Sequence, residues 1–114
     1  MQVKFLATAY APDYYEFKDE TVIVGIEGKR EEIDLSELRY GDRYDGIEFD
    51  SIEMYYPFVI RDIRRDESGI LHLVLCQKAT EGHWRESEWL GSNEYQKGKT
   101  YIKEISDGEA QENQ

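Results

Sequence analysis

The sequence contains a single cysteine and two prolines, and it has no long uninterrupted run of apolar residues. One cysteine excludes an internal disulfide framework and any zinc or iron–sulfur site built from several cysteines. Without about 18 consecutive apolar residues, and without a signal-peptide core after Met1, we expect no membrane contact and a reducing, cytoplasmic location. The sequence also has no glycine-rich phosphate loop and no internal repeat.

Positive charge is scarce, because 25 aspartates and glutamates face 14 lysines and arginines and give a formal net charge of −11. The acids are concentrated early in the chain, where residues 1–57 hold 14 of them. Such a field repels phosphate backbones, so direct binding of nucleic acid is disfavoured. The charge attracts cations or a basic groove on another protein, and it also keeps a small domain soluble.

A hydrophobic fraction of 39% is too high for a disordered acidic chain, and 114 residues suit one domain. We expect a single β domain over residues 1–106 and a disordered tail over 107–114. Alternating apolar residues predict a mainly β fold, either a small antiparallel sandwich or a partly open barrel of about six to eight short strands. Residues 36–41, between a capping serine and a glycine, allow at most one short helical turn.

The strongest local pattern is a β-hairpin. Two strand-like runs, 58–65 and 70–78, flank four turn residues that end in Gly69. Both faces of the second run are largely apolar, so we expect it to be a central, covered strand.

Shorter patterns surround this hairpin. Asp42 to Gly46 has the composition of a loop, and the charges in the run 29–35 suit an edge strand. The run 83–90 would present Trp84, Glu86 and Glu88 on one face if it is extended. Strands are thus predicted outside the hairpin at residues 3–8, 21–26, 29–35, 83–90 and 100–105.

Chemical motifs are weak. His72 and Cys76 lie roughly 13 Å apart in an extended strand, at ~3.3 Å per residue, so they cannot form a dyad or grip one metal ion. A calcium site is conceivable where four acids cluster around Gly46, but their spacing does not match the EF-hand pattern, and a solvated acidic loop is favoured. These four acids are Asp42, Asp45, Glu48 and Asp50. We therefore predict no cofactor and no enzymatic activity.

The aromatic residues are more informative. Adjacent tyrosines occur at Tyr14/Tyr15 and at Tyr55/Tyr56, and in an extended strand one ring of each pair faces outward. Exposed Tyr and Trp beside carboxylates are typical of protein interfaces, although ordinary packing of rings across a sheet is an alternative. Two tryptophans, Trp84 and Trp89, would also suit stacking on a sugar. The predicted interaction surface consists of Tyr14, Tyr55, Trp84 and Glu86.

The stretches 4–17, 33–36, 71–77 and 82–87 carry a resemblance to other proteins. Through them about half of the chain resembles small uncharacterised proteins encoded in bacteriophages and prophages, often near tail genes. The resemblance implies a non-enzymatic accessory or virion protein, located in the cytoplasm of a bacterial host or in the virion. The acidic segment 37–53 lies outside it.

Three functions therefore stay open. The leading one is a structural, assembly or protein-interaction module whose partner is a phage or host protein. The second is an acidic DNA mimic that blocks the basic groove of a host defence nuclease, because residues 13–53 hold 14 acids and five bases. The third is a carbohydrate-binding module. The oligomeric state is left open by the sequence.

Overall fold

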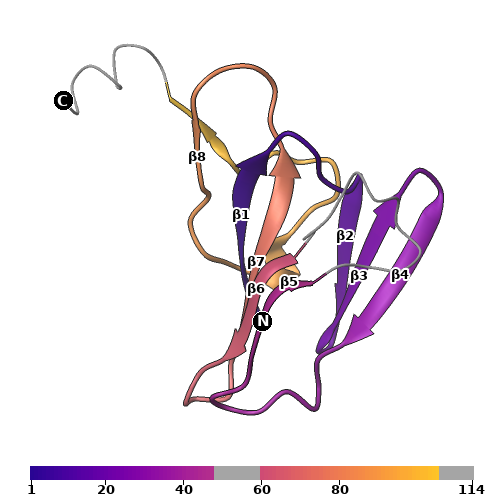
Figure 1. Ribbon diagram of the computed structural model, residues 1–114, viewed down its shortest axis with the longest axis vertical. Coiled ribbons are helices and arrows are strands. Elements are labelled where there is room, and N and C mark those ends of the chain that lie inside the picture. The colour runs from indigo at the N-terminus through magenta and orange to yellow at the C-terminus, as the bar shows by residue number, and fades with distance from the viewer. Residues whose placement is uncertain (48–59, 106–114) are drawn as a thin grey trace.

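The computed structural model describes residues 1–47 and 60–105 of the chain. Figure 1 shows this part as short strands linked by loops. The described residues contain one 3₁₀ turn and no α-helix. The elements are β1 (Gln2–Thr8), β2 (Tyr14–Lys18), β3 (Thr21–Ile26), β4 (Lys29–Asp34), β5 (Arg43–Ile47), β6 (Ile60–Arg65), β7 (Leu71–Lys78), β8 (Trp84–Arg85), β9 (Leu90–Gly91), η1 (Ser92–Glu94) and β10 (Lys103–Glu104).

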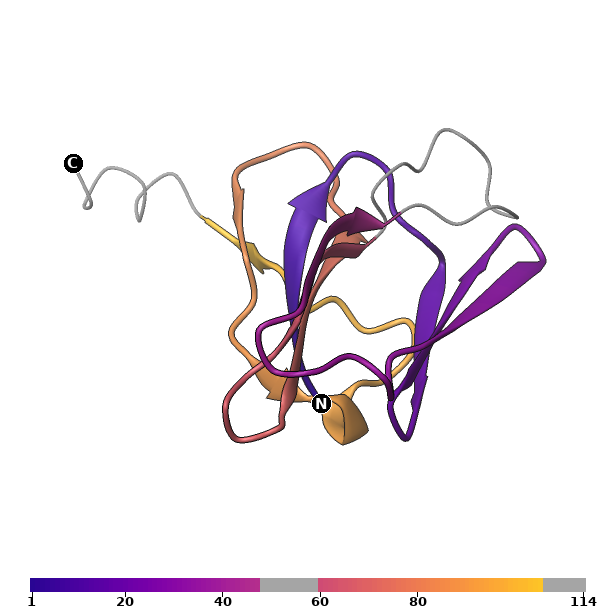
Figure 2. The ribbon, with the colours of Figure 1, turned by 60° about the horizontal axis from the view of Figure 1, so that its bottom comes forward.

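The strands form three sheets, and the prediction of a mainly β fold is confirmed. A five-stranded sheet has the order β5-β6-β7-β1-β9, a three-stranded sheet has the order β2-β3-β4, and β8 pairs with β10. Figure 2 shows the two larger sheets as layers that face each other. The described strands form no closed barrel. Between the layers lies the core, whose fully buried side chains are Val3, Phe5, Val22, Val24, Ile26, Ile60, Ile63, Leu71, Leu73 and Leu75.

The predicted hairpin is confirmed as the antiparallel pair β6–β7. Its turn is organised by Asp66, whose Oδ1 accepts the backbone N–H groups of Ser68 at 2.8 Å and Ile70 at 3.0 Å. The other carboxylate oxygen lies 2.8 Å from Nε2 of His72, and this hydrogen bond is the main cause that lowers the pKa of Asp66. Gly69 supplies the positive φ of +85° that closes the turn. Residues 58 and 59 lie outside the described part.

β7 occupies the centre of the large sheet, as expected. It pairs with β6 on one side and with β1 on the other. The β1–β7 pairing is parallel, with Val3 opposite Leu73 and Phe5 opposite Leu75, whereas the sequence suggested antiparallel neighbours. A parallel pair between the first strand and the seventh has no local turn to mark it, which is why the alternation pattern did not reveal it.

The small sheet follows its predicted pattern more closely. β3 is central, and β4 forms an edge of this sheet with its run of charged residues. Tyr15 is buried in the core, whereas Tyr14 lies on the opposite face. There the Tyr14 ring covers Gly25 so closely that a Cβ on this glycine would lie 2.1 Å from its Cζ. Only glycine fits beneath that ring without displacing it.

Three local expectations are wrong. Residues 43–47 form β5 and pair with β6, so the segment from Asp42 to Gly46 is not simply a loop. Residues 83–90 are not one strand, because β8 and β9 are two short strands with an irregular stretch between them. The last predicted strand, 100–105, is shorter than expected, because only β10 (Lys103–Glu104) within it is a strand. Residues 36–41 contain turns without a helix, while residues 106–114, including the predicted tail, lie outside the described part.

Arg65 connects the large five-stranded sheet to the small three-stranded sheet. Its guanidinium contacts both carboxylate oxygens of Glu20, at 2.7 Å and 3.2 Å. The same group donates to the backbone oxygens of Leu38 at 2.5 Å, Gly69 at 2.8 Å and Leu35 at 3.2 Å. The hydrogen bond from Arg65 lowers the pKa of Glu20. One planar cation thus ties the hairpin turn to the loop after β4.

Candidate protein-binding grooves

The segment 79–105 wraps around the β1 edge of the large sheet, and side-chain hydrogen bonds hold it there. The Ser87 hydroxyl accepts the N–H of Phe5 at 2.9 Å, and the N–H of Ser87 returns a 2.9 Å bond to the Phe5 oxygen. Gln77 Oε1 accepts the N–H groups of Tyr101 at 2.7 Å and Ile102 at 3.1 Å. These bonds replace a regular strand ladder and fix the positions of β8 and β10.

The tyrosine rings where this segment meets the sheets pack together as part of the core or against it. The rings of Phe5, Tyr95 and Tyr101 stack with centroid distances of 5.3–5.7 Å. Tyr15 joins this cluster and donates from its hydroxyl to the Cys76 backbone oxygen at 2.5 Å. Burial raises the pKa of Tyr15 and Tyr95. Ordinary sheet packing therefore accounts for these rings.

A first groove, called the Trp84 groove, lies where the parallel strands β1 and β7 both end. Its volume is about 430 Å³. Its lining residues include Ala7, Ala9, Ala79, Glu81, Gly82 and Trp84.

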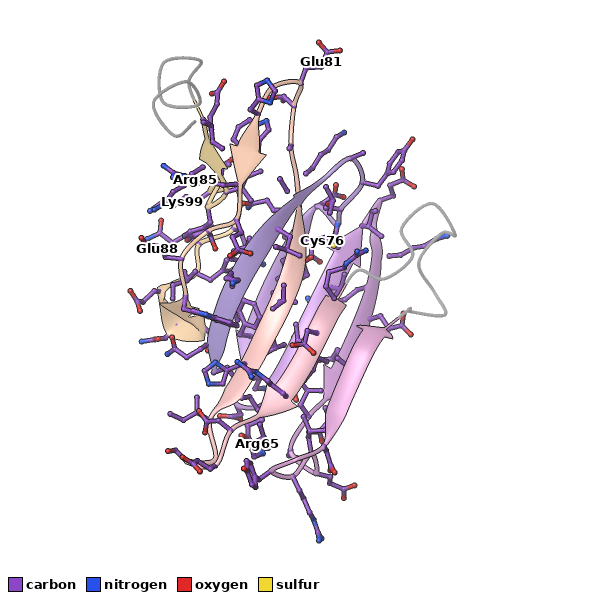
Figure 3. All side chains as sticks on the ribbon, turned by 60° about the vertical axis from the view of Figure 1, so that its left-hand side comes forward. Arg65, Cys76, Glu81, Arg85, Glu88 and Lys99 are labelled. Carbon is purple, nitrogen blue, oxygen red and sulfur yellow. The ribbon has the colours of Figure 1, made fainter. Side chains whose placement is uncertain are left out.

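The indole of Trp84 is anchored within this groove. It is partly buried against the core, and its Nε1–H donates to the Thr80 oxygen at 2.9 Å. Glu104 lies opposite Trp84 in the β8–β10 pair. A Cβ on Gly82 would lie 3.6 Å from Trp84 Nε1 and 3.8 Å from Glu104 Oε1, so this carboxylate lies next to the lining residue Gly82, at the edge of the groove. Figure 3 shows Glu81 at the tip of the loop between β7 and β8.

A second groove, called the Trp89 groove, has a volume of about 470 Å³. Its lining residues include Lys4, Arg85, Glu86, Glu88, Trp89 and Lys103. Figure 3 shows Arg85 and Glu88 along the segment that leads away from the Glu81 loop.

Both carboxylates of the Trp89 groove form ion pairs with lysines, and Arg85 adds a third cation to the lining. Lys4 bonds Glu86 at 3.0 Å, and Lys103 bonds Glu88 at 3.3 Å. Lys4 also lies 5.1 Å above the ring of Trp89, which is 40% exposed. The edge of the same ring meets His72, with centroids 5.1 Å apart.

The four residues predicted as an interaction surface do not form a single patch in the structure. Trp84 lines the first groove and Glu86 lines the second, so these two belong to different grooves. Tyr14 lies on the outer face of the small sheet, where Lys97 Nζ sits 4.7 Å from its ring centre. Tyr55 lies outside the described residues.

The structure gives little support to the other candidate sites, which are the metal sites and Cys76. Among residues 1–47 and 60–105, no group of three His, Cys, Asp or Glu side chains is placed to hold a metal ion. Oδ2 of Asp42 accepts the N–H of Arg39 at 3.0 Å, as in a turn. The side chain of Asp45 and residues 48–50 lie outside what the structure describes, so the proposed calcium loop stays a prediction. Cys76 is buried, which raises the pKa of its thiol.

Acidic residues of the small sheet are partly neutralised as well. Glu16 bonds Arg30 at 3.1 Å and Lys97 from the far segment, and the bond to Lys97 is the main cause that lowers its pKa. Glu20 is held by Arg65. These two acids are therefore unsuited to imitating free phosphates.

Sequence reasoning missed Glu81, Glu104 and the alanines as site residues. Nothing in their local sequence marks them, because the groove forms only when the ends of β1 and β7 meet β8 and β10. The exposed loop around Gly82 was the only available signal.

No family model, curated protein or solved structure matches this chain. Within residues 1–47 and 60–105, none of the elements is a helix with the length and apolar character required to span a bilayer.

Proposed function

We propose that the chain is a non-enzymatic protein-interaction module of phage or prophage origin, with a structural or assembly role, and that it binds a partner protein through the Trp84 groove. The proposed origin rests on the sequence resemblance, and the proposed partner is a phage or host protein.

One observation carries the choice of surface. The Trp84 groove combines an anchored tryptophan with small alanines at a strand end, so a partner side chain can enter without displacing a bulky residue. Rigid aromatic anchors beside apolar pockets are typical hot spots of protein interfaces. Tyr10, which is 62% exposed, follows Ala9 directly and offers additional contact area.

The two alternative functions receive less support. Stacking on a sugar by both tryptophans would need them on one surface, whereas they line different grooves. A DNA mimic would need a row of carboxylates without cationic partners, whereas Glu16 and Glu20 are paired.

The test is to fill the groove. Proteins encoded beside the gene are expressed one by one with the wild-type chain, with Ala9→Trp and with Ser68→Trp, and purified complexes are compared. Ala9 borders the groove and is exposed, whereas Ser68 is exposed in the distant β6–β7 turn. We expect a partner that is retained by Ser68→Trp and lost by Ala9→Trp. Equal retention by both variants, or no partner for the wild-type chain, would contradict the proposal.

A further inference from the structure

The two grooves differ more in the pairing of their charged residues than in their volume. In the Trp89 groove, Glu86 and Glu88 each have a lysine partner. Within the described part of the chain, Glu81 and Glu104 at the Trp84 groove form no ion pair and no side-chain hydrogen bond. Both side chains are exposed. The groove thus presents two carboxylates whose attraction for a cation is not used by any residue that the structure describes.

The walls of the groove suit the rest of a long basic side chain. Ala7 and Ala79 are apolar and partly buried against the core, so they can pack against an aliphatic stem. The Trp84 N–H is already bonded to Thr80, which leaves the ring surface as the part that a ligand can meet. A tryptophan ring attracts ammonium and guanidinium groups through its negative face.

The field of the whole chain acts in the same direction. The net charge of −11 concentrates cationic groups near the surface and speeds their approach. No lysine or arginine is among the described residues that line the groove, and Lys78, at the end of β7, lies outside the lining. An anionic or purely apolar ligand would gain nothing from Glu81 and Glu104.

We infer that the Trp84 groove binds an arginine or lysine side chain of the partner, with the aliphatic stem on the alanines, the cationic head between Glu81 and Glu104, and Trp84 beside it. This inference rests on the proposed function and names the chemistry of its ligand. The Trp89 groove, with both of its carboxylates paired to lysines, serves as the internal reference.

The inference is testable with capped tripeptides as probes: acetyl-Gly-Arg-Gly-amide, and the same peptide with Lys, Leu or Glu in the centre. The ¹⁵N-labelled full chain has two indole N–H signals, which Trp84→Phe and Trp89→Phe assign. We expect the Arg and Lys peptides to shift the Trp84 signal and to leave the Trp89 signal in place. Added salt should weaken the response, because the carboxylates are exposed.

A pair of charge variants provides the control. Glu81→Gln with Glu104→Gln should weaken binding of the Arg peptide about fivefold, the combined effect of two exposed charge contacts. Glu86→Gln with Glu88→Gln should leave it unchanged, since this second pair already has lysine partners. The backbone amide spectrum shows whether each variant keeps the fold.

Each other outcome overturns the inference. A Leu peptide that shifts Trp84 as strongly as the Arg peptide, with no effect of the Gln variants, would define an apolar pocket. Preference for the Glu peptide, or no response to any peptide, would be equally negative. If Ala9→Trp still abolishes partner binding in such a case, the proposed function stands and only the ligand chemistry is wrong.

Discussion

The two tryptophans of this chain are five positions apart, yet they line grooves of different character. The Trp84 groove has its indole anchored against the core, and the two carboxylates beside it have no ion-pair partner among the described residues. The Trp89 groove has a more exposed indole, and both of its carboxylates are paired with lysines. Similar residues close together in sequence therefore do not define one binding surface. What distinguishes a candidate site here is charge that the fold leaves without a partner.

β7 is the middle strand of the large sheet, and the largest effect on stability should come from its centre. Leu73 is fully buried between the sheets. Replacing it by alanine should lower the free energy of unfolding by about 2–5 kcal/mol, because the lost contacts leave a cavity. Urea denaturation measures this loss of stability, and the NMR signals of both indole N–H groups should shift. A loss below ~1 kcal/mol would mean that Leu73 is not packed as described.

The two tryptophans should differ in their contribution to stability. Trp84→Ala removes a ring packed against the core and should cost about 2–3 kcal/mol, somewhat less than a fully buried tryptophan. Trp89→Ala removes a ring that is 40% exposed and should cost less than about 1 kcal/mol. Thermal unfolding of the two variants gives the comparison. Equal losses would remove the distinction between an anchored and a superficial ring.

Replacing Gln77 tests whether its hydrogen bonds fix the position of β10 and thus of Glu104. Its amide holds the stretch that leads into β10 by bonding Tyr101, Ile102 and the Lys99 oxygen. Gln77→Ala should cost about 1–3 kcal/mol, because two N–H groups lose their acceptor. Hydrogen exchange at the Tyr101 and Ile102 amides should accelerate. Gln77→Glu keeps an acceptor oxygen and is the control; equal acceleration in it would argue against this role.

The smallest effect is expected at the Trp89 groove. Lys4→Ala removes the pair with Glu86 and the contact with the Trp89 ring, and should change stability by less than about 1 kcal/mol. The difference from wild type should shrink further in high salt, since the groups are partly exposed. Chemical denaturation at two ionic strengths provides the values. A larger loss that persists in salt would show that packing, not charge, holds this groove.

Local patterns were sufficient to predict the strongly alternating strands. The β6–β7 hairpin combines alternating apolar residues with a turn that Asp66 and Gly69 specify, so sequence and structure agree. The strand β4 was predicted as an edge from its run of charged residues, and it lies at the edge of the small sheet. The segment from Asp42 to Gly46 was misread because pairing with β6 overrides its loop-like composition.

The candidate site was less predictable than the strands. Trp84 was chosen from the sequence, but its expected neighbour Glu86 lies in the other groove. The extended run 83–90 is interrupted where Ser87 bonds Phe5 across 82 positions of sequence. Glu104 reaches the site only through the β8–β10 pairing. Such long-range contacts have no signature in residue type or spacing.

Quenching of tryptophan fluorescence tests the central claim most directly, because it reports the charge beside each ring. In Trp89→Phe only Trp84 emits, and in Trp84→Phe only Trp89 emits. Unpaired carboxylates should concentrate caesium and exclude iodide, so the ratio of caesium to iodide quenching should be higher for Trp84 than for Trp89. Equal ratios, or a higher ratio for Trp89, would contradict the difference between the two grooves.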